Sequence, residues 1–115
     1  REKTILDALD HPEYCGEMTE ADKALVTGWK ALDPGKVLDY AIRMSNSSVF
    51  KRLGYLLELH GLADTRYLDR LRKRLRPGYS KLEPLNPCRG PYCSRWLLRI
   101  NMDMDLQDQD QRREG

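Results

Sequence analysis

The fold is decided by one apolar stretch near the middle of the chain, Arg52-Leu53-Gly54-Tyr55-Leu56-Leu57-Glu58-Leu59-His60-Gly61-Leu62. Its leucines recur at helical spacing and predict a helix with a buried stripe that runs from Val49 to His60. Gly54 lies inside this helix, where glycine costs roughly 1 kcal/mol relative to alanine. We expect the close approach of a second helix at Gly54 to compensate for that cost. Gly61 is a natural C-terminal end for the helix.

Helical spacing extends from this stretch towards both ends of the chain. Asp33-Pro34 predicts a helix start, because Asp is a good N-cap and Pro fits the first helical position. Pro77-Gly78 should end the last helix. The expected helices cover residues 4–9, 19–32, 34–45, 47–60 and 64–75. We therefore expect a mainly α fold, a compact bundle of about five helices, within residues 1–76.

The composition changes after Gly78. Four prolines fall between Pro77 and Pro91. Residues 96–102 alternate in polarity and predict a strand that could pair with residues 79–82 as a small C-terminal β-hairpin. The fold class would then be α+β, with a loop and β element at residues 77–102 completing one domain of residues 1–102. The acidic, low-complexity residues 103–115 are expected to form a mobile tail.

Length and composition limit the protein classes that fit. The chain has 115 residues, of which 40% are hydrophobic and 33% are charged, as expected for one soluble globular domain. No membrane span or secretion signal is visible, and three cysteines without such a signal favour the cytoplasm. The sequence leaves open whether Cys88 and Cys93 form a local disulfide. The first residue is Arg1 rather than Met, which suggests a fragment or a processed chain.

The net charge of +2 hides an uneven distribution. Residues 1–42 carry five basic and nine acidic side chains, whereas residues 43–76 carry nine basic and three acidic ones. Residues 77–102 add four basic side chains and one acidic one, and the tail is acidic. A basic centre between acidic ends bears on partners rather than on fold.

The basic side chains of the last expected helix should form a row on the face opposite Leu68, Leu71 and Leu75. Rows of this kind neutralise phosphates, although a solvated helix face is a common alternative. Basic residues of the third and fourth helices and of the C-terminal loop could extend the row. The candidate nucleic-acid-binding residues are Arg43, Lys51, Arg52, Arg66, Arg70, Lys73, Arg74 and Arg95.

Tyr92 and Trp96 lie on either side of Arg95 in the loop before the expected strand. Such aromatic residues can stack on bases. More often they fix a proline-rich loop to the core, and we favour that interpretation.

Catalytic and metal-binding patterns are not apparent in the sequence. The two histidines, His11 and His60, lie at expected helix ends. A histidine near the C-terminal end of a helix interacts favourably with the helix dipole. Cysteines are too few and wrongly spaced for a zinc site, and no glycine-rich phosphate loop occurs. We therefore expect a protein that is not an enzyme and that uses no metal or cofactor.

Several stretches resemble the C-terminal domain of AbiEi-type antitoxins, which are transcriptional regulators of type IV toxin–antitoxin systems. They are residues 3–16 with His11-Pro12 and Cys15-Gly16, residues 38–41, residues 47–59 with Arg52, Gly54 and Tyr55, and residues 85–87 and 90–101 with Arg95 and Trp96. Together the similar stretches extend over most of residues 3–102.

The resemblance implies a repressor of its own operon that counteracts a cognate nucleotidyltransferase-type toxin. In that family a winged helix-turn-helix usually precedes this domain, and none is visible in this sequence. The family's C-terminal domain is associated with antitoxin activity, and its basic surface can assist DNA binding. The alternative function is a protein–protein interaction scaffold with no nucleic-acid role.

Overall fold

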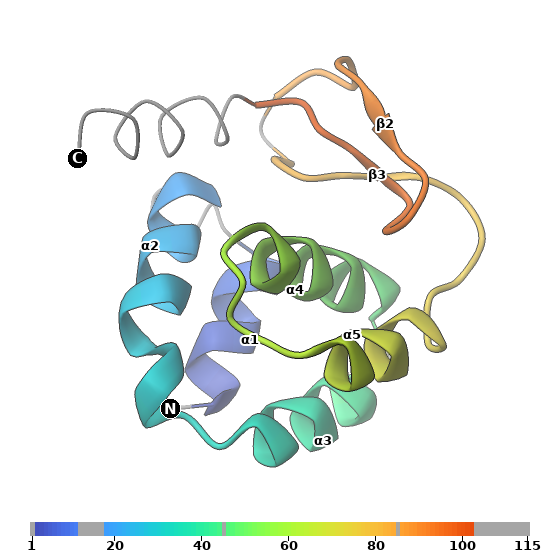
Figure 1. Ribbon diagram of the computed structural model, residues 1–115. Helices are drawn as coiled ribbons and strands as arrows, with labels where there is room; N and C mark the ends of the chain where they lie inside the picture. Colours follow the sequence, from blue (N-terminus) through green and yellow to red (C-terminus); the bar gives the residue numbers. More distant parts are fainter. Residues whose placement is uncertain (1, 12–17, 45, 85, 103–115) are drawn as a thin grey trace.

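The computed structural model describes residues 2–11, 18–44, 46–84 and 86–102. Five α-helices are followed by a small sheet of three short strands in this part of the chain (Figure 1). The expected mainly helical α+β fold is therefore confirmed. The elements are α1 (Glu2–Asp10), α2 (Met18–Gly28), the 3₁₀ turn η2 (Trp29–Ala31), α3 (Pro34–Met44), α4 (Ser47–Leu59), α5 (Thr65–Arg72), β1 (Ser80–Lys81), β2 (Tyr92–Cys93) and β3 (Leu98–Arg99). The expected tail, residues 103–115, lies outside the described residues.

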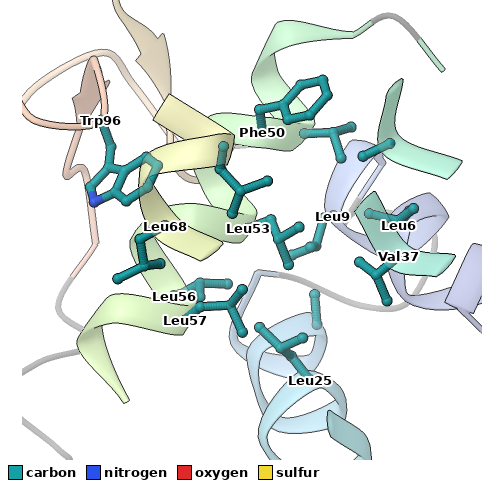
Figure 2. Packing of buried hydrophobic residues seen from close by; sticks show 14 of the residues in the cluster. Leu6, Leu9, Leu25, Val37, Phe50, Leu53, Leu56, Leu57, Leu68 and Trp96 are labelled. Carbon is teal, nitrogen blue, oxygen red and sulfur yellow. The ribbon is translucent and has the colours of Figure 1, made fainter. Parts of the chain in front are cut away.

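The helix α4 is the centre of the fold. It packs against α1 and α5, and the sheet lies over a further side of it (Figure 1). Leu53, Leu56 and Leu57 are fully buried and point into the apolar cluster between the helices (Figure 2). A helix that is buried around most of its circumference has no solvated face. The decisive stretch of sequence is therefore the element on which the others assemble.

The helix ends follow from local hydrogen bonds. The Asn46 side chain accepts from the Ser48 amide at 3.0 Å, and the Asp64 side chain accepts from the Tyr67 amide at 2.9 Å. These contacts satisfy amides at the starts of α4 and α5. After α4, Gly61 adopts φ +64°, the left-handed conformation that glycine tolerates best.

The helix α5 is shorter than the expected range of residues 64–75. It ends at Arg72. The Arg74 amide then donates to the Leu71 carbonyl, and the Leu75 amide donates to the Arg72 carbonyl. Bonds of this i to i−3 type tighten the chain into turns before Pro77, since the residue preceding a proline disfavours the helical conformation.

The sheet differs from the expected hairpin. β3 pairs in parallel with β1, in the register Ser80 with Leu98, and antiparallel with β2, in the register Cys93 with Leu98. Residues 79–82 do supply a neighbour for β3, but the antiparallel partner is β2, which the strand pattern does not predict. A parallel pair needs a long crossover, and the proline-rich segment between β1 and β3 provides it.

Gly54 faces an indole ring rather than a second helix. A Cβ atom built on Gly54 would lie only 2.0 Å from the Cζ3 atom of Trp96, whose side chain is fully buried. The indole Nε1 donates to Glu58, one turn further along α4, at 2.7 Å. Arg95 donates to the same carboxylate at 2.6 Å. Trp96 therefore fixes the sheet to α4, and the expected helix–helix contact at Gly54 is wrong.

We expect Gly54→Ala to lower the free energy of unfolding by about 1–3 kcal/mol, because the added methyl group overpacks the Trp96 site by more than the gain in helix propensity. Gly28→Ala is the matched control, since nothing lies within 4 Å of a Cβ added there and its φ of −96° suits alanine. The control should be neutral or more stable by up to about 1 kcal/mol. Urea denaturation of both variants tests this, and equal stability of Gly54→Ala and the parent would contradict the packing account.

Candidate nucleic-acid interface

Four cations of α5 and the turn after it lie on the surface. Arg66, Arg70, Lys73 and Arg74 are exposed, whereas Leu68 and Leu71 on the opposite side are buried. The ion pairs between described residues do not involve these four side chains; on α5 the pair is Arg72 with Asp69, at 4.0 Å. The row expected from the sequence is thus present and open to solvent.

Four described carboxylates of the first forty residues have partners other than the α5 cations. Asp7 pairs with Lys3 and Glu20 pairs with Lys23, each within one helix. Asp22 contacts His60 at 2.8 Å, and Glu2 accepts from the Asp33 amide at 2.9 Å. The acidic N-terminal segment therefore does not neutralise the α5 cations through the contacts that the structure describes.

A groove runs between α3 and α5 and reaches the start of α4. Its larger compartment is a cavity of about 480 Å³, lined by Leu38, Ile42, Arg70, Lys73 and Arg74. A smaller compartment of about 180 Å³ is lined by Ile42, Ser47, Phe50, Arg74 and Arg76. The two compartments share Ile42 and Arg74, so they adjoin. We call them together the basic groove and the smaller one the inner pocket.

Arg76 is a groove residue that the sequence pattern does not select. It follows the last residue of the expected helix, so helical spacing does not predict on which face its side chain lies. Its backbone amide donates to the Ser47 hydroxyl oxygen at 3.1 Å, which holds the end of the α5 turn beside the start of α4. The signal that could have found Arg76 is the density of cations in residues 70–76.

Two predicted site residues are buried, and their expected place in the exposed row is wrong. Lys51 and Arg52 are only 3% and 6% exposed. Lys51 donates through Nζ to the Gly78 carbonyl at 2.8 Å and to the Ser80 hydroxyl at 3.0 Å. Arg52 donates to the carbonyls of Leu9 and Lys81 at 2.8 and 3.0 Å. Both cations act as hydrogen-bond donors inside the fold, as buried polar groups must.

The ammonium group of Lys51 carries a cost of burial. Burial, and then the nearby charge of Arg52, lower the pKa of Lys51 below its ordinary value of 10.5. The folded chain therefore binds fewer protons than the unfolded chain between the lowered pKa and 10.5, so stability rises with pH across that interval. Tyr67 acts in the opposite direction above pH 10, since burial raises its pKa and only the unfolded chain loses that proton.

We expect the free energy of unfolding of the parent to increase between pH 8 and pH 10 more steeply than that of Lys51→Met. The variant removes the group whose deprotonation favours the folded state, while methionine keeps much of the aliphatic length of the lysine side chain. Chemical denaturation at several pH values measures the two slopes. Parallel slopes would show that Lys51 keeps an unperturbed charge in the folded chain.

The other two predicted cations lie apart from the lining of the basic groove. Arg43 is exposed on α3, with its Cζ atom 5.6 Å from the centroid of the Tyr40 ring. Arg95 is paired with Glu58, so its charge is offset within the fold. Arg43 and Arg95 both remain candidate phosphate contacts outside the groove, and the pairing with Glu58 offsets the charge of Arg95.

The exposed tyrosines form a separate feature near the sheet. Tyr79 and Tyr92 are 46% and 63% exposed and meet edge to face, with ring centroids 4.8 Å apart. The Cζ atom of Arg99 lies 4.1 Å from the centroid of Tyr92. We call these three residues the tyrosine–arginine patch.

Each histidine lies beside a carboxylate. His60 caps the end of α4 and contacts Asp22 of α2, and both side chains are largely buried. His11 lies 3.4 Å from Asp10. Cys88 and Cys93 are free thiols, and Cys15 lies outside the described residues. Within the described ranges no group of three His, Cys, Asp or Glu residues could hold a metal ion.

Comparison with known proteins adds no family. The chain matches no protein-family model, no curated protein and no solved structure. The resemblance to AbiEi-type antitoxins thus stays a prediction from the sequence. In the part of the chain that the structure describes, the helices are all too short or too polar to cross a membrane.

Proposed function

We propose that this domain is a non-enzymatic regulator module that binds the phosphate backbone of DNA through the basic groove. The observation that carries the proposal is the grouping of Arg70, Lys73, Arg74 and Arg76 along one groove, without carboxylate partners among the described residues. Each cation that neutralises a phosphate releases condensed counterions, and this favours binding at low salt.

The groove geometry favours weak binding with little sequence preference. Phosphate contacts position a protein on DNA, whereas contacts to base edges give specificity. The helix α5 has eight residues, or roughly 12 Å at the usual helical rise, and its outer side chains are mainly cations. Arginine and lysine on so short a helix suit contacts to the DNA phosphates better than contacts to many bases in the major groove. Sequence-specific recognition would need an additional DNA-binding element.

The cellular role that we propose for this binding is that of an antitoxin and transcriptional regulator that counteracts a nucleotidyltransferase-type toxin. This part of the proposal rests on the stretches of sequence described above, in particular Gly54, Tyr55, Arg95 and Trp96. The structure gives Gly54 and Trp96 a role in packing the sheet on α4. Those positions therefore support a shared fold more directly than a shared activity.

A protein–protein scaffold is the second candidate function, and the tyrosine–arginine patch favours it. Tyrosine and arginine are enriched at protein interfaces because they bring a large contact area and hydrogen-bonding groups together. Tyr79 and Tyr92 are large and exposed, as such anchor residues are in a free protein. A scaffold would bind its partner at this patch and leave the α5 cations solvated.

We expect the parent protein to bind duplex DNA in a salt-sensitive manner and Arg70→Glu with Lys73→Glu to weaken that binding by at least about tenfold at low salt. Loss of two phosphate contacts should also reduce the slope of log K against log salt concentration by about 2. Fluorescence anisotropy with a labelled duplex at 50 and 200 mM salt measures both quantities.

Lys23→Glu with Lys30→Glu is the matched control, since it changes the net charge equally at exposed positions on α2 and η2. This control should retain most of the affinity. Equal DNA binding by the parent and the groove variant would remove the groove from the mechanism. If the parent does not bind DNA at either salt concentration, the scaffold is favoured.

We expect co-expression of this protein to restore the growth of cells that produce a cognate nucleotidyltransferase-type toxin. Neutralisation would follow from direct binding or from repression of the shared operon, and expressing the toxin from an unrelated promoter isolates the first route. Growth curves measure the rescue. Continued toxicity with both proteins present would contradict the antitoxin role and would leave DNA binding to stand by itself.

A further inference from the structure

We propose that the inner pocket is a subsite for a phosphomonoester, so that the basic groove prefers the phosphorylated end of a strand to an internal phosphate. This inference rests on the proposed binding of nucleic acid. It assigns to the inner pocket a chemical selectivity that a solvated row of cations would lack. Three features support it: its donors, its charge and its size.

The donors of the inner pocket are Arg74, Arg76 and Ser47. The two guanidinium groups offer five N–H donors each and match the oxygens of phosphate in a bidentate manner. Ser47 accepts the Arg76 amide at 3.1 Å, so its own hydroxyl proton is left to donate to an anion. The pocket thus combines two cations with an oriented neutral donor.

The charge of the pocket suits a dianion. A phosphodiester within a strand carries one negative charge, whereas a phosphomonoester carries about −1.5 to −2 at pH 7, because its second pKa lies near 6. Arg74 and Arg76 together supply two positive charges, and neither takes part in the ion pairs between described residues. A terminal phosphate would therefore gain more from the two arginines than an internal one.

The size of the two compartments suits a terminal nucleotide. Typical ligand pockets span roughly 300–1,000 Å³. The inner pocket, at about 180 Å³, is smaller than that range and has apolar walls at Ile42 and Phe50. The larger compartment, at about 480 Å³, falls within the range and adds Leu38 as an apolar surface. A phosphate in the inner pocket would place the attached nucleoside in the larger compartment.

The ligand chemistry is a nucleoside phosphomonoester, and it has two possible sources, the end of a strand or a free nucleotide. Fluorescence anisotropy with three duplexes of one sequence tests the preference: one with 5′-phosphates, one with 3′-phosphates and one with hydroxyl ends. We expect one phosphorylated duplex to bind at least about fivefold more tightly than the hydroxyl duplex at pH 7.5. The preference should shrink at pH 5, where the monoester gains a proton.

Because Arg76 also belongs to the basic groove, Arg76→Gln should weaken binding of all three duplexes. It should also abolish the preference, so that the phosphorylated and hydroxyl duplexes bind with equal affinity. Arg66→Gln is the matched control, since Arg66 is exposed on the same basic surface but does not line either compartment. The control should keep the full preference. Thermal melting of both variants checks that they fold like the parent.

Competition with adenosine 5′-monophosphate separates the two sources. Displacement of the phosphorylated duplex by this nucleotide at equal molar concentrations would identify the free nucleotide as a ligand, and failure to displace it would identify the strand end. Equal affinity for all three duplexes, with binding still lost in Arg70→Glu with Lys73→Glu, would overturn the phosphate subsite and leave the proposed function intact. Absence of binding to every duplex would overturn both.

Discussion

The burial of α4 around most of its circumference is the constraint on which the rest of the structure depends. The side chains of a central helix are removed from water, so its polar groups need hydrogen-bond partners within the protein. Its apolar side is covered by α1 and α5, within a cluster to which α2 and α3 also contribute, while its cations reach the carbonyls of Leu9, Gly78 and Lys81. Those carbonyls belong to the end of α1 and to the chain around β1. The same helix therefore holds together the bundle and the sheet.

The sheet is too small to be stable alone, and its attachment to α4 explains its persistence. Two-residue strands contribute few hydrogen bonds, and isolated hairpins are marginal in water. Trp96 places its ring against Gly54 and its Nε1 against Glu58, which lies one turn away on the same face. Arg95 completes the contact through the same carboxylate. Truncating a buried tryptophan to alanine typically costs about 3–5 kcal/mol, so this attachment contributes strongly to the stability of the sheet.

The sequence predicts the helices better than the contacts between them. Periodicity and capping residues are local signals, so the starts at Asp33-Pro34, Asn46 and Asp64 can be found from neighbours in the chain. The pairing of β3 depends on residues far away, and a two-residue strand such as β2 leaves almost no pattern to detect. Gly54 shows the same limit, because its glycine indicates a close neighbour without naming Trp96.

The same limit separates the residues of the candidate site that the sequence predicts correctly from those that it does not. The surface position of four cations could be predicted because helical spacing puts them on the face opposite the buried leucines of α5. They are Arg66, Arg70, Lys73 and Arg74. Lys51 and Arg52 could not be distinguished from them, because the residue type of a cation does not show whether its helix is buried or exposed. Their burial depends on carbonyl acceptors that other segments provide.

The separation of charge along the chain gives the basic groove its importance. Asp7 and Glu20 pair within α1 and α2, Glu2 accepts from a backbone amide, and Asp22 contacts His60, so these described carboxylates are engaged away from α5. The α5 cations gain some stability from the carboxyl-terminal end of that helix, which favours positive charge. That effect accounts for Arg70 and Lys73 but not for Arg76, which lies beyond the helix and is held beside Ser47 by a backbone hydrogen bond. Arg76 and Ser47 line one small pocket together, and helix stability does not explain that arrangement. The proposed anion subsite would explain it.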